Sequence, residues 1–185
     1  VIIPIANHKE GVNEKVDEVA NRLKAAGIRV EVDDRDQSAG WKFNEYELKG
    51  VPVRIAIGPR DLENNDAEVA RRDTLEKEVV PFDNLVEHIQ QLLKDIQQNL
   101  FDKALKFREE NTRKADTWEE FVDLLDNHPG FIYAHWDGTP ETEDKIKELT
   151  KATIRCIPFN NPLEEGKCIL TGKPSKQRVL FARSY

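Results

Sequence analysis

Apolar residues recur at helical spacing, without interruption, from position 82 to position 105 of this chain. Residues three or four positions apart share one face of a helix, so the pattern predicts a single long amphipathic helix. We expect this helix to leave a first domain, residues 1–103, and to lead into a second, residues 104–185. The charged stretch "REENTRKADT" that follows predicts its end. The residues that set the period are Phe82, Leu85, Val86, Ile89, Leu92, Leu93, Ile96, Leu100, Phe101, Ala104 and Leu105.

Before the long helix, strand-like and helix-like patterns alternate along the chain. Val16, Val19, Ala20 and Leu23 lie at helical spacing and precede Gly27, a residue that favours helix C-termini. Such alternation is typical of an α/β fold, here with a mixed sheet. Strands are expected at "VIIPI", "IRVEVDD", "VPVRIAIG", "AEVARRD" and "EKEVVPF", and a further helix at "FNEYELKG".

Beyond the long helix, the sequence predicts a small second α/β domain. Thr139 and Pro140 suit the N-cap and the first position of a helix, because Thr caps amide groups and Pro lacks the amide that would stay unpaired there. Helices are expected at "TWEEFVDLLDN" and "ETEDKIKELTKA", and strands at "GFIYAHW", "TIRCIPF", "KCILTG" and "RVLFARSY".

Composition restricts the class of protein. The net charge of −7 argues against binding nucleic acid along a broad basic surface, although it leaves room for a local contact. No run approaches the roughly 20 apolar residues of a membrane span. Cys156 and Cys168 are too few for a disulfide framework, so we expect a cytoplasmic protein. A chain that begins at Val1 and contains no methionine is expected to be a piece of a longer protein.

Residues 40–61 combine aromatic rings with charges in a way that suggests a binding surface. The predicted helix places Trp41 and Leu48 on one side, where we expect them to anchor it to the sheet, and Phe43 and Glu47 on another. An aromatic ring beside a carboxylate suits an unstacked guanine, and Arg54 on the next strand suits the O6 and N7 acceptors of a purine. From spacing alone, the favoured alternative is that the rings are core and the charges are solvated.

The stretch "VDDRDQSAGWKFNEYELKGVPVRIAIGPRDLENN" closely resembles the anticodon-binding domain of the prolyl-tRNA synthetase family, of its archaeal and eukaryotic type. "ALKFREENT" and "GKPSKQRVLFARSY" resemble the C-terminal portion of that family, so the resemblance runs along the whole chain. It implies a mixed-sheet α/β fold and a tRNA(Pro) partner, whose anticodon carries two guanines. The base-reading positions that it implies are Phe43, Glu47, Arg54 and Lys77. For Lys77, an ordinary surface lysine is an equal alternative.

The resemblance also implies what the longer protein does. It would use ATP and Mg²⁺ to ligate proline to tRNA(Pro), as a homodimer, with Tyr185 reaching towards the catalytic domain of the same chain. We expect no catalysis from these residues, which contain no class II motif, no Walker A motif and no nucleophile with a paired base. The main alternative is a stand-alone tRNA-binding or regulatory module. A domain that docks another protein through its aromatic helix is a weaker one.

Members of the family often carry a zinc site of four cysteines near the C-terminus. We expect no zinc here, because one thiolate of four cannot build a tetrahedral structural site. His135, in "GFIYAHW", is expected to be a hydrogen-bonded structural residue rather than a catalytic one. Alignment on "HWDGTPETEDKIK" and "KCILTGK" places at the four ligand positions Asp137, Thr142, Cys168 and either Leu170 or Thr171.

Overall fold

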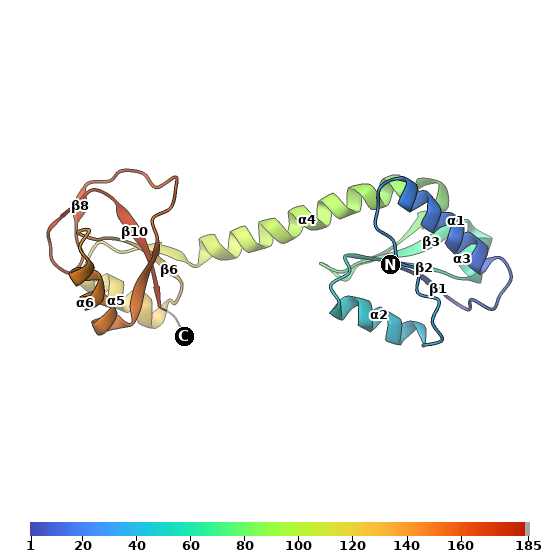
Figure 1. Cartoon of the computed structure of the whole chain (residues 1–185), viewed down its shortest axis with the longest axis horizontal. Coiled ribbons are helices and arrows are strands. Elements are labelled where there is room, and N and C mark those ends of the chain that lie inside the picture. The colour runs from blue at the N-terminus through green and yellow to red at the C-terminus, as the bar shows by residue number, and fades with distance from the viewer. Residues whose placement is uncertain (184–185) are drawn as a thin grey trace. The chain divides into compact units, whose positions relative to one another are not determined.

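A computed structural model describes residues 1–183, and the contacts between Cα atoms divide the chain into two compact units. The first unit is Val1–Asp102 and the second is Lys103–Tyr185. Each unit has its own sheet, helices and apolar core (Figure 1). The predicted fold class, a mixed-sheet α/β domain followed by a long helix and a small α/β domain, is confirmed.

The first unit is built on a four-stranded sheet with the strand order β1-β2-β3-β4. β1 (Ile2–Pro4) runs parallel to β2 (Val53–Ile57). β3 (Asp66–Arg71) and β4 (Lys77–Pro81) extend the sheet with antiparallel pairing. The sheet is therefore mixed, as the alternating sequence pattern predicted.

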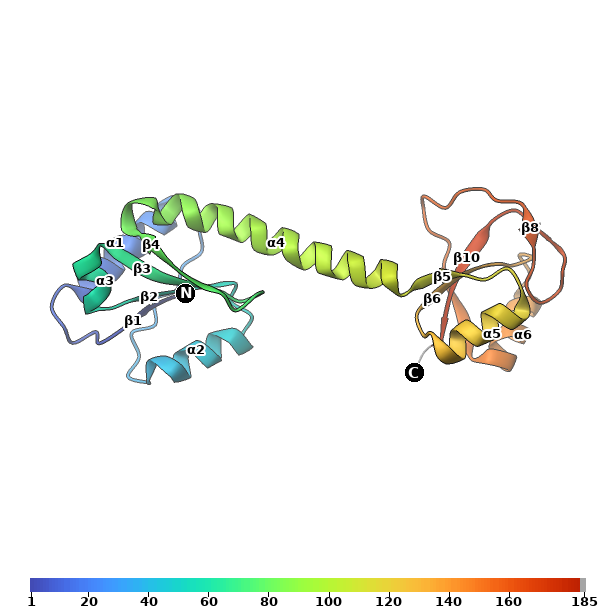
Figure 2. The ribbon, with the colours of Figure 1, turned by 180° about the vertical axis from the view of Figure 1, so that it is seen from behind.

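Helices cover both faces of this sheet. α1 (Val12–Ala25) and α4 (Leu85–Glu110) lie on one face, and α2 (Ala39–Leu48) lies on the other (Figures 1 and 2). The short α3 (Pro59–Asn64) precedes β3, and the 3₁₀ turn η1 (Phe82–Asn84) precedes α4. The apolar core fills the space between the sheet and the first pair of helices, and includes Ile2, Val16, Leu23, Ile55, Val69, Phe82 and Ile89.

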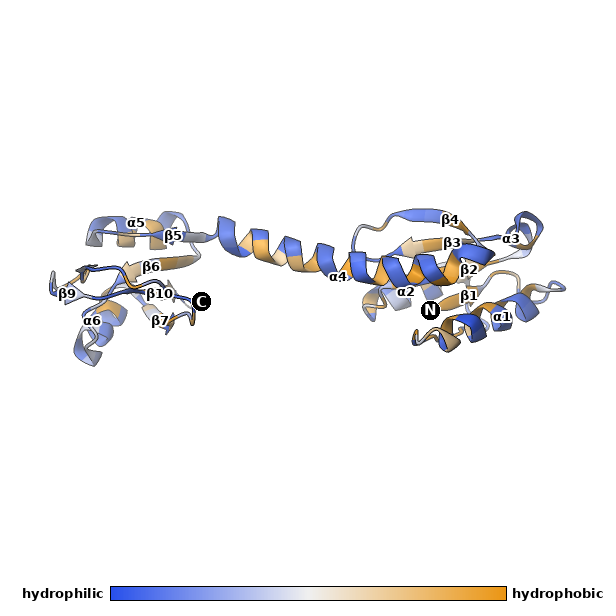
Figure 3. Ribbon diagram, turned by 90° about the horizontal axis from the view of Figure 1, so that it is seen from above, coloured by the Kyte–Doolittle hydropathy of each residue, from blue (hydrophilic) through white to orange (hydrophobic). Residues whose placement is uncertain are grey.

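The predicted long helix is confirmed as α4, with Phe82 in the turn that precedes it. Hydrophobic and hydrophilic residues alternate along it in Figure 3, as an amphipathic helix requires. Four of its residues are buried, each three or four positions from the next: Leu85, Ile89, Leu92 and Ile96. No helix within residues 1–183 is long and apolar enough to cross a membrane.

The second unit is built on a four-stranded sheet with the order β5-β6-β10-β7. β5 (Thr112–Lys114) pairs in parallel with β6 (Phe131–His135), while β10 (Arg178–Arg183) pairs antiparallel with β6 and with β7 (Ala152–Cys156). Two helices pack against one face of the sheet through the core residues Phe121, Leu125, Ile132, Ile146 and Phe181. These helices are α5 (Trp118–Asn127) and α6 (Pro140–Thr150).

Three strand predictions need correction. The strand expected at "IRVEVDD" is reduced to one bridge between Val32 and Ile2, so most of that segment lies beside the sheet without joining it. The strand expected at "KCILTG" is reduced to β8 (Gly166–Lys167), which pairs with β9 (Pro174–Ser175). Conversely, β5 lies inside a charged stretch that predicted only the end of a helix.

Candidate nucleic-acid interface

Four residues implied by the resemblance meet at one pocket of the first unit. Arg54 on β2 and Lys77 on β4 lie in one row across the sheet, because the strand register pairs each of them with Ala70 on β3. α2 contributes Phe43 and Glu47 to the same pocket, a shallow one of about 50 Å³. That volume is too small to enclose a purine, so a base would bind across the rim. The other lining residues are Tyr46, Val51, Ala70, Arg71, Arg72 and Leu75.

The attachment of α2 differs from the prediction. Trp41 and Leu48 do not anchor the helix, since they are 48% and 79% exposed. Tyr46, 2% exposed, faces the protein instead, and its hydroxyl donates a 2.8 Å hydrogen bond to Glu31. Lys42, 3% exposed, packs on the same side. Both buried side chains are amphipathic, with a long apolar body and a polar tip, and hydrophobicity alone does not identify them as anchors.

Lys42 reaches a buried acidic residue. Its Nζ donates to the backbone oxygen of Asp33 at 3.0 Å and lies 3.8 Å from the Asp33 carboxylate. Arg35 donates two side-chain hydrogen bonds, of 2.9 and 2.8 Å, to the same carboxylate. These bonds from Arg35, assisted by the charge of Lys42, lower the pKa of Asp33 to about 2. The N-terminal half of α2 is therefore held by an ionic network.

Arg54 is buried and stacked. Its guanidinium carbon lies 3.5 Å from the centroid of the Phe43 ring, within the range of a cation–π contact. Burial lowers the pKa of Arg54, while the nearby carboxylates of Glu68 and Glu47 oppose that shift. Within residues 1–183, its Nη1 is a buried side-chain nitrogen that has no hydrogen-bond partner. Because Nη1 is enclosed by the protein, an external acceptor would meet the other guanidinium nitrogens of Arg54 unless the side chain moves.

Glu47 presents a free carboxylate beside this arginine. Its side chain is exposed and makes no hydrogen bond or ion pair with the described part of the chain. Its backbone oxygen accepts a 2.7 Å hydrogen bond from Nε of Arg72, which lies just after β3. That bond ties the end of α2 to the β3–β4 hairpin and leaves the carboxylate of Glu47 available as an acceptor.

Hydrogen bonds link the β3–β4 hairpin to α4. Arg71 donates hydrogen bonds of 2.8 and 2.7 Å to the carboxylate of Asp73, and Asn99 on α4 donates to the same carboxylate. Hydrogen bonds from Arg71 are the largest contribution that lowers the pKa of Asp73, so this carboxylate stays ionised. The hairpin that carries Lys77 is consequently linked to α4.

Sequence reasoning missed Glu68, whose carboxylate lies between the two basic residues of the pocket. Its Oε1 is 3.6 Å from Nη1 of Arg54 and 3.4 Å from Nζ of Lys77. Alternation within "AEVARRD" was a usable signal, because it places Glu68 and Ala70 on one face of β3. The identity of the facing residues depended on the pairing of three strands, which the sequence alone did not reveal.

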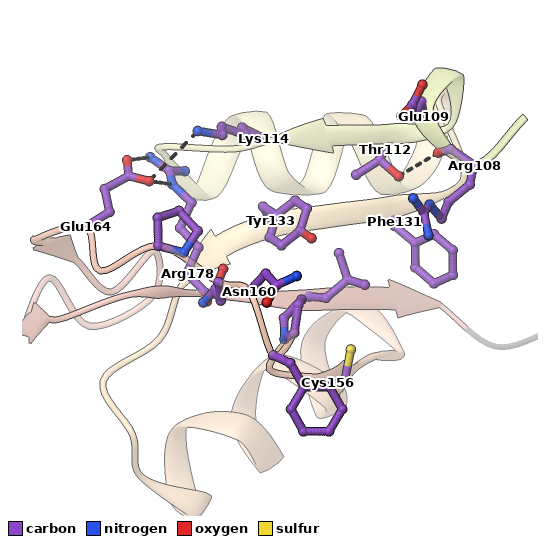
Figure 4. A pocket seen from close by; sticks show the side chains of 15 residues that line it. Arg108, Glu109, Thr112, Lys114, Phe131, Tyr133, Cys156, Asn160, Glu164 and Arg178 are labelled. Atoms are coloured by element: carbon purple, nitrogen blue, oxygen red, sulfur yellow. Dashed lines mark hydrogen bonds and ion pairs between the residues drawn. The ribbon is translucent and has the colours of Figure 1, made fainter. Parts of the chain in front are cut away.

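A larger pocket lies elsewhere, on the second unit, with a volume of about 750 Å³. Figure 4 shows Tyr133 of β6 near its middle and Phe131 of the same strand towards one side. Both alternate along β6 with the core residues Ile132 and Ala134, so they lie on the opposite face of the sheet. Arg178 does not reach into the pocket as a free cation, since it donates hydrogen bonds of 3.1 and 2.9 Å to Glu164. Lys114 lies 3.8 Å from the same carboxylate. Volume therefore does not single out the site that the sequence predicted.

Three of the aligned zinc-ligand positions, Asp137, Thr142 and Thr171, meet in a hydrogen-bonded cluster. The hydroxyls of Thr142 and Thr171 each donate to Oδ2 of Asp137 at 2.9 Å, and the hydroxyl of Thr139 donates to Oδ1 at 2.8 Å. Burial raises the pKa of Asp137, but these hydrogen bonds together outweigh it and lower the pKa. Three hydroxyls around one carboxylate do not fit a structural zinc ion, which prefers thiolates and imidazoles. Residues 1–183 hold no cluster of three His, Cys, Asp or Glu side chains suited to a metal.

Two further predictions concern His135 and Tyr185. His135 is 4% exposed, and its Nδ1 lies 3.1 Å from the hydroxyl of Ser175. Burial lowers its pKa and so favours the neutral imidazole, and its hydrogen bond is that expected of a structural histidine. Tyr185, the residue implied to approach a catalytic domain, lies outside the described residues.

Comparisons with known proteins match both units. Residues 1–92 match a family model described as "Anticodon binding domain", and residues 118–185 match one described as "Prolyl-tRNA synthetase, C-terminal". Proteins named "Proline--tRNA ligase" from Porphyromonas gingivalis and Phocaeicola vulgatus are 56% and 55% identical to the chain over its whole length. One from Flavobacterium johnsoniae is 52% identical over the same extent. In each case the chain spans 38% of the length of the relative.

Proposed function

The chain belongs to the prolyl-tRNA synthetase family, and on that premise we propose that residues 1–103 read the anticodon of tRNA(Pro). Residues 104–185 are the C-terminal domain in this proposal. One observation carries the assignment of the site: Phe43, Glu47, Arg54 and Lys77 line the same shallow pocket. They come from one helix and two strands, so their meeting is a property of the fold.

The pocket complements guanine in its pattern of donors and acceptors. Arg54 and Lys77 can only donate, and the carboxylate of Glu47 can only accept. Guanine offers acceptors at O6 and N7, and donors at N1 and the exocyclic amine. A guanine across the rim therefore pairs its donors with Glu47 and its acceptors with Arg54 or Lys77. Adenine has a donor at position 6 and no amine at position 2, so the same groups would reject it.

Phe43 and Arg54 together form the surface on which a base would stack. The guanidinium already covers one face of the Phe43 ring, at 3.5 Å from its centroid. In single-stranded RNA recognition, bases stack on arginine planes as well as on aromatic rings. We assign the stacking surface to the Phe43–Arg54 pair, in which the ring supports the guanidinium plane.

The activity of the longer protein is part of the proposal, because the chain spans 38% of the relatives' length. By analogy with their name, it ligates proline to tRNA(Pro) with ATP and Mg²⁺, as a cytoplasmic homodimer. Tyr185 would contact the catalytic domain. Within residues 1–183, no cluster of acidic, histidine or cysteine side chains fits Mg²⁺, so we derive no catalytic step from these residues.

A titration with RNA hairpins tests the proposal. The hairpin carries the two anticodon guanines in its loop, and matched hairpins replace each guanine in turn by adenine. We expect each replacement to weaken binding by about tenfold, because a lost bidentate base contact costs ~1–3 kcal/mol. Equal affinity for all the hairpins would contradict base reading.

A further inference from the structure

Glu68 is the one acidic side chain that contacts both basic residues of the pocket within the described part of the chain. Its Oε1 atom lies 3.6 Å from Nη1 of Arg54 on β2 and 3.4 Å from Nζ of Lys77 on β4. The side chain is 37% exposed, so it lies at the edge of the pocket. A single carboxylate oxygen thus connects two strands that do not pair with each other.

The strand register explains why these three side chains meet. Ala70 faces both Arg54 and Lys77, and its methyl group is too short to fill the space between them. Glu68 is two residues away on the same face of β3, so its longer side chain reaches diagonally to both. The residues directly opposite Glu68 are Ala56 and Val79, which offer no charge.

Both contacts are longer than normal hydrogen bonds, which span 2.7–3.2 Å for N–H···O pairs. The carboxylate therefore attracts the two cations without using up their donors. This agrees with Nη1 of Arg54, which is buried without a hydrogen-bond partner. A shorter, bidentate salt bridge would instead saturate the guanidinium and remove it from base recognition.

We propose that Glu68 is a positioning residue for base recognition: its carboxylate holds Arg54 and Lys77 at the pocket with their donors directed to guanine. This inference rests on the proposed function. Glu68 itself makes no contact with the base.

The proposal predicts a loss of base discrimination that simple electrostatics does not. Loss of a negative charge from an RNA-binding surface strengthens binding to every RNA, because it removes repulsion of the phosphates. Loss of a positioning residue instead lowers the discrimination ratio, defined as the Kd of the adenine hairpin divided by the Kd of the guanine hairpin. The ratio is insensitive to a charge effect that both hairpins share.

The test compares Glu68→Gln with the wild-type chain and with Glu78→Gln. Glu78 makes the matched control, since it lies on the neighbouring strand, carries the same charge, and contacts His88 of α4 on the other face of the sheet. We expect Glu68→Gln to lower the discrimination ratio about fivefold or more and Glu78→Gln to leave it unchanged. Thermal unfolding of both variants verifies that they fold.

A double-mutant cycle tests whether Glu68 acts on base recognition through Arg54. We compare the effect of Glu68→Gln in the wild-type and Arg54→Ala backgrounds. Without Arg54, Glu68 has no guanidinium to position. Glu68→Gln should then change the discrimination ratio at the guanine read by Arg54 by less than about twofold. Glu68→Asp, which keeps the charge, should recover part of the ratio.

The outcomes separate the two proposals. A wild-type chain without discrimination would contradict the proposed function, and this inference with it. A wild-type chain that discriminates, together with an unchanged ratio in Glu68→Gln, would overturn the role of Glu68 alone. An equal loss from Glu68→Gln with and without Arg54 would also overturn it.

Discussion

At the scale of single residues, the site depends on charges that are partly or fully removed from water. Arg54 is 9% exposed, Lys42 is 3% exposed and Asp33 is 2% exposed. Burial of a charge is costly unless a partner compensates it. Asp33 accepts hydrogen bonds from Arg35 and Lys42, whereas Arg54 has an aromatic face and a carboxylate at 3.6 Å, with no hydrogen bond at Nη1 within the described residues. The residue with the weakest compensation is the one that the proposed function assigns to the ligand.

The Asp33 network predicts a pH-dependent stability. The pKa of Asp33 falls from an ordinary value of 3.8 to about 2 in the folded chain. A group whose pKa is depressed by folding stabilises the fold above its unfolded pKa, and this stabilisation is lost as pH falls towards its folded pKa. We expect Asp33→Asn to lower the free energy of unfolding by about 2 kcal/mol at neutral pH.

Urea unfolding of both proteins at a series of pH values measures this effect. The difference between wild type and Asp33→Asn should shrink as pH falls from about 4 towards 2, because the wild-type carboxyl is then protonated too. A difference that is constant over this range would show that Asp33 stabilises the fold without its charge.

At the scale of elements, the sequence located α2 correctly and misjudged its orientation. The helix overlaps the expected "FNEYELKG" but begins earlier, at Ala39, and ends at Leu48. The side that faces the protein carries Lys42 and Tyr46 instead of Trp41 and Leu48. Hydrophobic periodicity was reliable for α1 and α4, which pack on an apolar core. It was unreliable for α2, because the sheet face beneath this helix carries Arg54 and is not simply apolar.

Truncation of two residues of α2 to alanine tests this orientation. Tyr46→Ala should lower the free energy of unfolding by about 3 kcal/mol, since it removes a buried ring and its hydrogen bond to Glu31. Leu48→Ala should change it by less than about 0.5 kcal/mol, because that side chain is exposed. Chemical denaturation measures both, and the reverse ranking would restore the original prediction.

The site shows a similar division between what was predictable and what was not. Phe43, Glu47 and Arg54 were identified because they are close in sequence and match a family pattern. Ala70 lines this pocket, and Glu68 contacts its two basic residues, only because strand pairing brings together positions far apart in the chain. The strand β5 was missed for a related reason: its three residues gain strand structure from their pairing with β6.

At the scale of the whole molecule, the charge distribution restricts how RNA is bound. The chain has a net charge of −7, yet Arg54, Arg71, Arg72 and Lys77 all line one pocket. Two of these are engaged within the protein, Arg71 with Asp73 and Arg72 with a backbone oxygen. Few cations are left for phosphates, so the proposed recognition depends on bases more than on backbone charge.

This distribution predicts a weak salt dependence of RNA binding. Each phosphate neutralised on a single strand contributes about −0.7 to the slope of log K against log salt concentration. With one or two phosphate contacts, we expect a slope of about −1 for the guanine hairpin, measured by titrations across a salt series. A slope steeper than about −3 would indicate that backbone contacts dominate instead.

The stacking of Arg54 on Phe43 also has a thermodynamic consequence. A free arginine side chain loses up to about 2 kcal/mol of rotamer entropy when it is immobilised. Here the ring already restrains the guanidinium in the absence of RNA, so most of that entropy is lost when the chain folds and little is lost when the ligand arrives. The proposed recognition surface is therefore expected to be preorganised, and its affinity for a correct base should come with a small entropic penalty.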